Sequence, residues 1–271
     1  MSADPGLVGT LLARIERWRR PGLTTIGICG AQGSGKSTLV AAMAGQLTLR
    51  GVRVATLSLD DLYLTRAARL RLAAEVHPLF ATRGVPGTHD IALGLATLDA
   101  LKRGEAAPLP RFDKASDDRA PESQWPRAPA DTQVLLLEGW CLGASPQEEA
   151  ALAEPVNLLE AKEDPDGVWR RHANAALAGE YQRLFARIDR LILLAAPSWH
   201  VVAAWREQQE AELRRMGGSA VMDPAGVARF VRHYERLTRH VLATMPGYAD
   251  LTVRLGAGRE VLNIETASTG H

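Results

Sequence analysis

The chain has 271 residues, of which 46% are apolar, and a formal net charge of +1. This length allows one large α/β domain or two small ones. The balanced charge excludes a global field that would attract nucleic acid or a membrane surface.

No targeting signal is visible in the sequence. The first residues lack a basic segment followed by an apolar run, and no apolar run reaches the roughly 18 residues of a transmembrane helix. We therefore expect a cytoplasmic protein that contacts neither a membrane nor nucleic acid. The two cysteines, Cys29 and Cys141, lie in or just after apolar segments, which favours buried thiols over a disulfide.

The first half of the chain alternates helices and strands. Apolar residues at helical spacing predict a helix over residues 7–20, and a short apolar run predicts a buried strand over residues 24–29. Further elements are expected as a helix at 39–49, a strand at 52–59, and helices at 65–80 and 91–103. Residues 108–132 contain five prolines and predict a long loop, which in a compact domain is either functional or disordered.

The second half continues the same alternation. A continuous apolar run predicts a buried strand over residues 134–139, typical of a parallel sheet. The remaining elements are expected as a helix at 168–186, a strand at 191–195, a helix at 199–216, a helix that begins at Pro224 with Asp223 as its N-cap, and a strand at 251–255. Gly217 and Gly218 are a candidate hinge, and the tail from Ala267 is expected to be frayed.

A glycine-rich stretch joins the first strand to the helix that follows it. It fits the pattern G-x-x-x-x-G-K-[ST] of a phosphate-binding P-loop, in which backbone N–H groups and a helix N-terminus face the phosphates. Lys36 is expected to reach the β- and γ-phosphates, and the Ser37 hydroxyl to ligate Mg²⁺. The expected nucleotide-binding residues are Gly30, Ala31, Gln32, Gly33, Ser34, Gly35, Lys36, Ser37 and Thr38.

Carboxylates follow two other strands of the predicted sheet. Asp60 and Asp61 end the strand at 52–59, and Glu138 lies at the end of the strand at 134–139. Ligands of parallel sheets bind at the carboxyl ends of the strands. Asp60 is the candidate base for an acceptor hydroxyl and a candidate metal ligand, and Glu138 is the second candidate metal ligand. Asp61 is either an acceptor contact or a solvated turn or cap residue.

The alternating elements predict a three-layer α/β fold of the P-loop type with a five-stranded, mainly parallel sheet and a helical lid. We expect one domain over residues 1–271, with an N-terminal helix within 1–22, acceptor-binding insertions within 60–132 and a lid over 199–222. A lid would bring cations to the transferred phosphoryl group. The candidates are Arg206, expected to be catalytic, Arg214 and Arg215; a solvated helix face is the alternative for each of them.

Several stretches resemble a known family. The P-loop with residues 58–63 and 134–139 resembles the phosphoribulokinase/uridine kinase superfamily of P-loop small-molecule kinases. Within it, the chain resembles the plant-type D-glycerate 3-kinase family and its bacterial and fungal relatives. The stretches that carry this second resemblance are R-G-V-P-G-T-H-D at 83–90, P-R-F-D-K-A-S at 110–116, L-E-G-W-C-L-G at 137–143, W-R-E-Q-Q-E at 205–210 and Y-E-R-L-T at 234–238. The resemblance implies a kinase that uses ATP and Mg²⁺, with Asp60 on the acceptor side.

Glycerate carries one carboxylate and two hydroxyls, so a site for it needs cations and polar partners. His89 is expected to be exposed, and Asp90 is alternatively the cap of the helix at 91–103. Only 5% of the residues are aromatic, with Tyr63, Phe112 and Trp125 near the site, which favours a small polar acceptor over a nucleoside. The expected acceptor-binding residues are Asp61, Tyr63, Arg83, His89, Asp90, Asp113, Lys114 and Arg119.

These patterns predict an ATP-dependent kinase of a small hydroxy acid, with conversion of D-glycerate to 3-phospho-D-glycerate as the best match, acting as a monomer or a homodimer. Pantothenate, uridine and ribulose 5-phosphate stay open as acceptors. A regulatory P-loop NTPase is the alternative from another class, but the sequence lacks an [NT]-K-x-D guanine signature and a Cys/His cluster. The balanced charge disfavours a nucleic-acid-binding ATPase.

Overall fold

The computed structural model describes residues 3–215 and 224–266. The expected hinge at Gly217 and Gly218, the Asp223 cap, the end of the expected lid and the tail from Ala267 lie outside the described residues.

Six strands form the main sheet in the order β2–β5–β1–β6–β7–β8. The parallel strands are β1 (Thr24–Gly30), β2 (Val54–Ser58), β5 (Val134–Gly139), β6 (Arg190–Ala195) and β7 (Leu251–Leu255). This confirms the expected α/β fold with a mainly parallel sheet. The expected number of five strands is wrong, because β8 (Val261–Thr266) adds an antiparallel edge strand. Its residues are exposed or half-buried, so it shows no buried apolar run.

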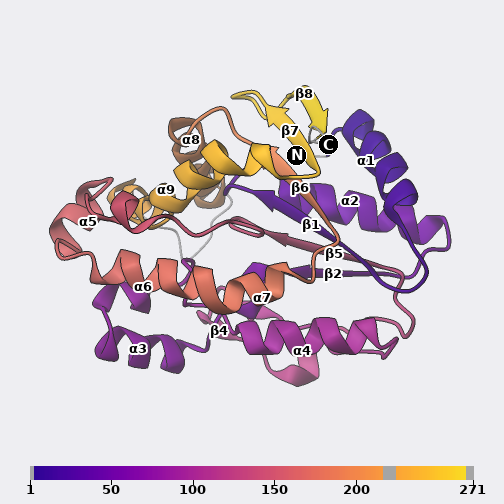
Figure 1. The fold of residues 1–271 in the computed structure, drawn as a ribbon, viewed down its shortest axis with the longest axis horizontal. Coiled ribbons are helices and arrows are strands. Elements are labelled where there is room, and N and C mark those ends of the chain that lie inside the picture. The colour runs from indigo at the N-terminus through magenta and orange to yellow at the C-terminus, as the bar shows by residue number, and fades with distance from the viewer. Residues whose placement is uncertain (1–2, 216–223, 267–271) are drawn as a thin grey trace.

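Helices cover both faces of the sheet (Figure 1). In that view α1 (Pro5–Trp18) and α2 (Lys36–Leu49) lie on one side of the sheet, at the right, and α4 (Ile91–Lys102), α6 (Val168–Ala176) and α7 (Gln182–Phe185) lie on the other side, in the lower part. The helices α8 (Trp199–Arg215) and α9 (Pro224–Thr244) pack against each other. No described helix is long and apolar enough to cross a bilayer.

Two helical segments differ from the expectation. The helix expected at 65–80 ends earlier, as α3 (Arg66–Glu75), and a short 3₁₀ turn, η2 (Pro78–Ala81), follows it. Pro78 explains the break, because proline lacks an N–H group and forces the residue before it, His77, into an extended conformation. The helix α5 (Leu158–Glu163) was not expected, since its six residues are too few for a periodic pattern.

The expected helix at 168–186 is present with one irregularity. A π-helical turn, η5 (Leu177–Tyr181), separates α6 from α7. The long loop at 108–132 carries short elements of its own. They are β3 (Phe112–Asp113) and β4 (Asp118–Arg119), which pair as an antiparallel ribbon, and the 3₁₀ turn η3 (Glu122–Gln124).

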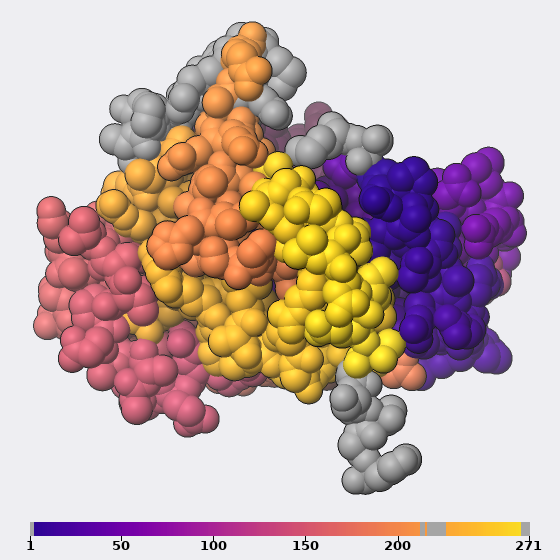
Figure 2. Space-filling view, turned by 90° about the horizontal axis from the view of Figure 1, so that it is seen from above, coloured from indigo at the N-terminus to yellow at the C-terminus, as the bar shows by residue number. Residues whose placement is uncertain are grey.

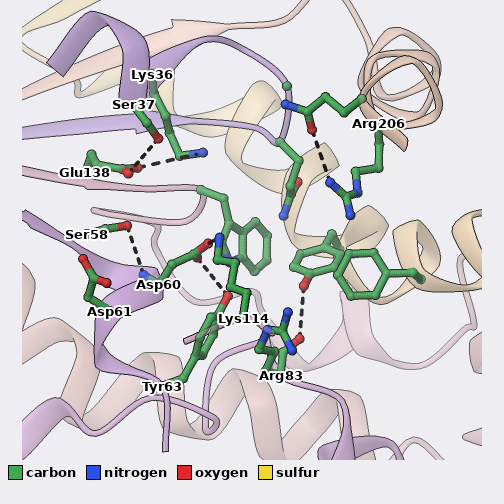
Figure 3. A pocket seen from close by; sticks show the side chains of 16 residues that line it. Lys36, Ser37, Ser58, Asp60, Asp61, Tyr63, Arg83, Lys114, Glu138 and Arg206 are labelled. Atoms are coloured by element: carbon green, nitrogen blue, oxygen red, sulfur yellow. Dashed lines mark hydrogen bonds and ion pairs between the residues drawn. The ribbon is translucent and has the colours of Figure 1, made fainter. Parts of the chain in front are cut away.

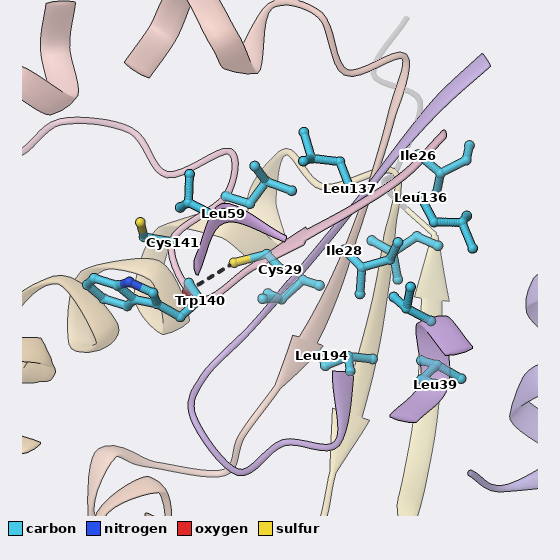
Figure 4. Close-up of a cluster of buried hydrophobic side chains, with 14 of the residues drawn as sticks. Ile26, Ile28, Cys29, Leu39, Leu59, Leu136, Leu137, Trp140, Cys141 and Leu194 are labelled. Carbon is cyan, nitrogen blue, oxygen red and sulfur yellow. Dashed lines mark hydrogen bonds between the residues drawn. The ribbon is translucent and has the colours of Figure 1, made fainter. Parts of the chain in front are cut away.

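The core lies between the central strands and the helices on both faces. All six residues of β5 are buried, because β5 lies between β1 and β2 and has helices on both sides. Cys29 and Cys141 are buried free thiols, as expected, and burial raises the pKa of Cys29 to about 12. Both cysteines belong to one buried apolar cluster, of which Figure 4 also labels Ile26, Ile28, Leu39, Leu59, Leu136, Leu137 and Leu194.

Candidate active site

Three neighbouring strand ends meet at one cavity, as the sequence predicts. The order β2–β5–β1 brings together Asp60, which follows β2, Glu138 in β5 and the P-loop after β1. The cavity has a volume of about 580 Å³ (Figure 3). Its lining residues are Gln32, Gly33, Lys36, Ser37, Ser58, Asp60, Asp61, Tyr63, Arg83, Lys114, Glu138, Trp140, Arg206, Gln209, Phe230 and Tyr234.

The P-loop bends through two glycines with positive φ. Gly33 has φ +78° and Gly35 has φ +84°, a conformation that side-chain-bearing residues rarely adopt. Gly33 also packs directly against the next layer, since a Cβ at this position would lie only 2.6 Å from the Cβ of Trp205 on α8. Lys36 and Ser37 are the first two residues of α2. They therefore lie at a helix N-terminus, which favours phosphate binding.

The C-terminal hairpin supports this loop. Arg259, between β7 and β8, donates a 2.6 Å hydrogen bond to the carbonyl oxygen of Gly33, and its guanidinium lies 5.0 Å from the centre of the Trp205 ring. Trp205 in turn donates a 2.7 Å hydrogen bond to the carbonyl of Ala257 in the same hairpin. The P-loop, α8 and the hairpin are therefore one packed unit.

Glu138 faces the two functional residues at the start of α2. Its Oε1 accepts a 2.9 Å hydrogen bond from the Ser37 hydroxyl, and its Oε2 lies 3.9 Å from the Lys36 ammonium. The Glu138 side chain is 9% exposed, and its Oε2 has no hydrogen-bond partner among the described residues. The unpartnered carboxylate oxygen of Glu138 and the hydroxyl of Ser37 are two hard oxygen donors that lie side by side. Such a pair fits Mg²⁺.

This site is not an all-protein metal cage. Within the described residues, no group of three or more His, Cys, Asp or Glu residues is arranged to hold a metal ion. Mg²⁺ commonly binds through one or two protein ligands together with substrate phosphates and water, and two protein donors match that pattern.

Asp60 is held ionised by its neighbours. It lies in the 3₁₀ turn η1 (Leu59–Leu62); its Oδ2 lies 2.8 Å from the Lys114 ammonium, and its Oδ1 accepts a 2.8 Å hydrogen bond from the Tyr63 hydroxyl. Burial alone would raise the pKa of Asp60, but the charges of Lys114 and Lys36 and these hydrogen bonds together hold it below its usual value. The carboxylate is thus ionised at neutral pH.

Asp61 differs from its neighbour. Its oxygens accept a 3.2 Å hydrogen bond from the Phe112 amide and a 3.4 Å one from the Arg111 guanidinium. Burial raises its pKa, although Arg111 opposes the shift. Asp61 lines the cavity, but these contacts give it a clear role in holding β3 against η1.

Two arginines point into the cavity from other segments. Arg206 on α8 is ion-paired with Glu210 and donates a 3.3 Å hydrogen bond to the side-chain oxygen of Gln209. Its guanidinium lies 5.4 Å from the centre of the Phe230 ring. Arg83, from the loop after η2, lies across the cavity from Lys36 (Figure 3). Cations therefore reach the cavity from the lid-side helix and from the loop with the R-G-V-P-G-T-H-D motif. The side chain of Arg214 lies outside the described residues.

The expectation that His89 is exposed is wrong. His89 is only 2% exposed, because its ring stacks on Tyr63 with 4.6 Å between centroids and its Nδ1 lies 2.5 Å from the Tyr181 hydroxyl. Burial lowers its pKa to about 3, so the imidazole is neutral. His89 does not line the cavity; it supports Tyr63, which contacts Asp60.

Three other expected acceptor contacts are also absent from the cavity lining. Asp90 caps α4 by accepting a 3.0 Å hydrogen bond from the Leu93 amide, which was the stated alternative, and pairs with Arg119 at 2.9 Å. Asp113 accepts hydrogen bonds from Ala115 and Ser116 and so closes the turn between β3 and β4. These short polar side chains are engaged by nearby backbone groups, and they shape the loops that carry Lys114 and Arg83.

The aromatic residues at the site differ from those expected from the sequence, because Phe112 and Trp125 do not line the cavity. Four aromatic side chains line the cavity: Tyr63, Trp140, Phe230 and Tyr234. Trp140 directly follows β5, while Phe230 and Tyr234 lie on α9. Tyr234 donates a 3.1 Å hydrogen bond to the carbonyl of Arg83, and Trp140 donates a 2.9 Å one to the carbonyl of Gly84. These residues also fix the loop that carries Arg83.

A second cavity, of about 540 Å³, lies on the other side of the P-loop. It is lined by the start of α1, the P-loop, Gln209 of α8 and the hairpin residues 258–261, and it shares Gly33 and Gln209 with the first cavity. Figure 2 shows the hairpin in yellow between α8 in orange and α1 in indigo. The P-loop therefore forms a wall of both cavities, and Gly33 lines each of them.

The chain is similar to several known proteins in sequence and in fold. Residues 25–150 match the model of the phosphoribulokinase / uridine kinase family. The uncharacterized kinase mug58 of Schizosaccharomyces pombe is 36% identical over 246 residues, which cover 86% of this chain and 87% of that protein. The chain belongs to the phosphoribulokinase/uridine kinase family. The predicted resemblance is thereby confirmed, and the chain is a P-loop kinase.

Two further relatives of this kinase carry the name D-glycerate 3-kinase. The chloroplastic enzyme of Arabidopsis thaliana is 32% identical over 230 residues, which cover 81% of this chain but only 48% of that protein. The solved structure of D-glycerate 3-kinase from Cryptococcus neoformans superposes with a TM-score of 0.78 at 26% identity, covering 96% of this chain and 97% of that one. The structure of the YGR205w protein has the same fold, with a TM-score of 0.75.

Proposed function

We propose that this kinase transfers the γ-phosphoryl group of ATP to a hydroxyl of a small hydroxy acid, and that D-glycerate, converted to 3-phospho-D-glycerate, is its acceptor. The observation that carries the proposal is the position of the ionised Asp60 carboxylate in one cavity with Lys36, while Arg83 lies across from them. The names of the Arabidopsis and Cryptococcus relatives support the choice of acceptor.

The donor nucleotide binds along the P-loop. Its phosphates occupy the loop, where backbone N–H groups and Lys36 neutralise their charge. The nucleoside lies in the second cavity, which meets the first at Gly33. Ser37 and Glu138 hold Mg²⁺. Asp60 lines the same cavity and assists in binding the ion. When bound, the ion neutralises charge on the phosphates.

The acceptor occupies the first cavity. Arg83 binds its carboxylate, since a guanidinium presents a planar fork of donors that matches carboxylate geometry. Asp60 accepts the proton of the attacking hydroxyl, and Tyr63 and Lys114 orient the Asp60 carboxylate for this task. Arg206 on α8 stabilises the charge of the transferred group, and α8 acts as a lid.

An assay of ADP release tests the proposal. Purified protein is given ATP, Mg²⁺ and, in separate reactions, D-glycerate, pantothenate, uridine or ribulose 5-phosphate. We expect turnover that depends on D-glycerate. Turnover of another acceptor would refute D-glycerate and keep the kinase assignment, whereas nucleotide hydrolysis that ignores every acceptor would favour a regulatory NTPase.

The variant Lys36→Ala links turnover to the P-loop. We expect a loss of at least about a hundredfold, because the phosphates lose their only cation from the loop itself. Lys162→Ala, at an exposed position on α5, is the matched control and should retain turnover. Persistent activity in Lys36→Ala would contradict the placement of the nucleotide.

A further inference from the structure

Asp117 connects a buried arginine to the arginine of the acceptor cavity. It lies in the turn between β3 and β4 and has a positive φ of 56°, unusual for a residue with a side chain. Its Oδ2 lies 2.9 Å from Nη2 of Arg69, and its Oδ1 is ion-paired with Nη1 of Arg83. One carboxylate therefore serves two guanidinium groups, and we call these three residues the Arg69–Asp117–Arg83 cluster.

Arg69 anchors the cluster. It is only 1% exposed, and its guanidinium donates hydrogen bonds of 3.0 Å to the carbonyl of Ala81 and 2.7 Å to the carbonyl of Asp117. A buried arginine without its carboxylate partner is strongly unfavourable, so Arg69 and Asp117 hold each other in place. Because Arg69 belongs to α3, the β3–β4 turn is tied to that helix.

Arg83 is positioned by the same turn. Among the described residues, Asp117 is the one side chain that hydrogen-bonds the Arg83 guanidinium, and it uses only Nη1. The guanidinium also lies 5.4 Å from the centre of the Phe112 ring, and the backbone carbonyl of Arg83 accepts the hydrogen bond from Tyr234. This leaves Nε and Nη2 of Arg83 available to a ligand in the cavity.

The charges of the cluster do not cancel. Lys114 is paired with Asp60, and Arg206 is paired with Glu210. By contrast, Arg69 and Arg83 share the single carboxylate of Asp117 within the described part of the chain. One positive charge thus remains at the acceptor end of the cavity, which favours a ligand with an anionic group.

We propose that Asp117 is a positioning residue that presents Arg83 to an anionic group of the acceptor and so selects acid acceptors over their neutral counterparts. This inference rests on the proposed function, because it concerns the acceptor half of the same site. It predicts that the loss of Asp117 weakens acceptor binding, since an unheld Arg83 loses its preorganised position. If Asp117 merely competed with the acceptor for Arg83, its loss would strengthen binding.

The test compares pairs of acceptors that differ in charge. The wild-type protein and Asp117→Asn are assayed with D-glycerate and glycerol, pantothenate and panthenol, and ribulose 5-phosphate and ribulose. For the acid that the wild type uses, we expect a preference over the neutral partner of at least about tenfold in kcat/KM, and its loss in Asp117→Asn. The KM for that acid should rise about tenfold or more, and the KM for ATP should stay within about twofold.

A double variant separates positioning from simple damage to the fold. If Asp117 acts through Arg83, then Arg83→Gln combined with Asp117→Asn should be no worse than Arg83→Gln alone. Asp118→Asn is the matched control, because Asp118 lies in the same ribbon but, within the described part of the chain, accepts hydrogen bonds only from the Arg66 and Arg119 amides. It should keep the preference for acids.

The outcomes are distinguishable from those of the proposed function. Use of an acid other than D-glycerate, with the preference lost in Asp117→Asn, refutes D-glycerate and supports the role of Asp117. Equal use of the acid and its neutral partner by the wild type overturns the inference. An unchanged or lower KM for the acid in Asp117→Asn also overturns the inference. The same holds if the effects of Arg83→Gln and Asp117→Asn add up in the double variant.

Discussion

The Ser37 hydroxyl donates a 2.9 Å hydrogen bond to the Glu138 carboxylate, although the two residues are 101 positions apart in the chain. The bond joins the start of α2 to the end of β5. It fixes one carboxylate oxygen and leaves the other, Oε2, buried without a hydrogen-bond partner among the described residues. A buried acceptor of this kind is costly unless a ligand satisfies it, so we expect a cation to bind beside this pair.

Glu138→Gln tests this reading of the pair. The substitution keeps the shape of the side chain and the hydrogen bond to Ser37 but removes the negative charge. We expect the Mg²⁺ concentration for half-maximal turnover to rise by about tenfold or more. The measurement is a Mg²⁺ titration at saturating ATP, with the exposed Glu16→Gln as control. An unchanged Mg²⁺ requirement would remove Glu138 from the metal site.

Asp60→Asn tests the proton acceptor. The amide keeps a hydrogen bond with Tyr63 but cannot take a proton from the acceptor hydroxyl, so we expect kcat to fall by about 10²- to 10⁴-fold. The affinity for ATP, measured by calorimetry, should change little. Asp61→Asn is the matched comparison and should have a much smaller effect on kcat, because Asp61 contacts Arg111 and the Phe112 amide. Equal losses of turnover and ATP affinity in Asp60→Asn would place Asp60 chiefly on the metal.

Gly33→Ala tests the close packing of the P-loop. The new Cβ would collide with Trp205, and alanine is strained at the φ of +78°. We expect a loss of ATP affinity of at least about tenfold together with a lower free energy of unfolding. Gly45→Ala is the control, because Gly45 lies on α2 with open space where a Cβ would be, and it should stabilise the protein by about 0.5–1 kcal/mol. Normal nucleotide binding by Gly33→Ala would show that the loop and α8 can separate.

His233 predicts how stability depends on pH. Burial, followed by the nearby charge of Arg229, lowers the pKa of this histidine from 6.5 to about 4. Between these values the unfolded chain binds a proton that the folded protein does not. The free energy of unfolding should therefore fall as the pH drops from 6.5 towards 4, by up to about 1.4 kcal/mol per pH unit from this residue.

His233→Gln isolates that contribution. Denaturant unfolding of the variant and the wild type at several pH values between 4 and 7 gives the two slopes. The variant should lose less stability on acidification than the wild type. Above pH 6.5 the free energy of unfolding should depend on pH with the same slope in both proteins. The exposed His200→Gln should follow the wild type. Parallel curves for His233→Gln and the wild type would contradict the buried neutral state.

Local sequence patterns were sufficient to predict the parallel strands and the functional candidates at their ends. The apolar run of β5 identified a central strand, and strand adjacency then brought Glu138 and Asp60 beside the P-loop, because parallel strands end at one edge of a sheet. These predictions use only periodicity and the direction of the chain, and neither depends on how distant side chains pack.

The residues that escaped prediction depend on contacts between distant segments. His89 is buried by Tyr181, which lies 92 residues later and gives no local signal of that contact. Phe230 and Tyr234 belong to a helical stripe that any core-facing helix would show, and only the packing of α9 against the Arg83 loop turns them towards the cavity. The pairing of Asp117 with two arginines is invisible in the sequence for the same reason.

The hydrogen bond from Arg259 to Gly33 spans 226 residues. During synthesis the P-loop segment leaves the ribosome long before the hairpin that supports it, and the contact closes only after the strands between them have been made. We therefore expect the P-loop to reach its final form only after the hairpin has been made. We expect a chain that is truncated before this hairpin to bind ATP more weakly and so to gain less protection from it.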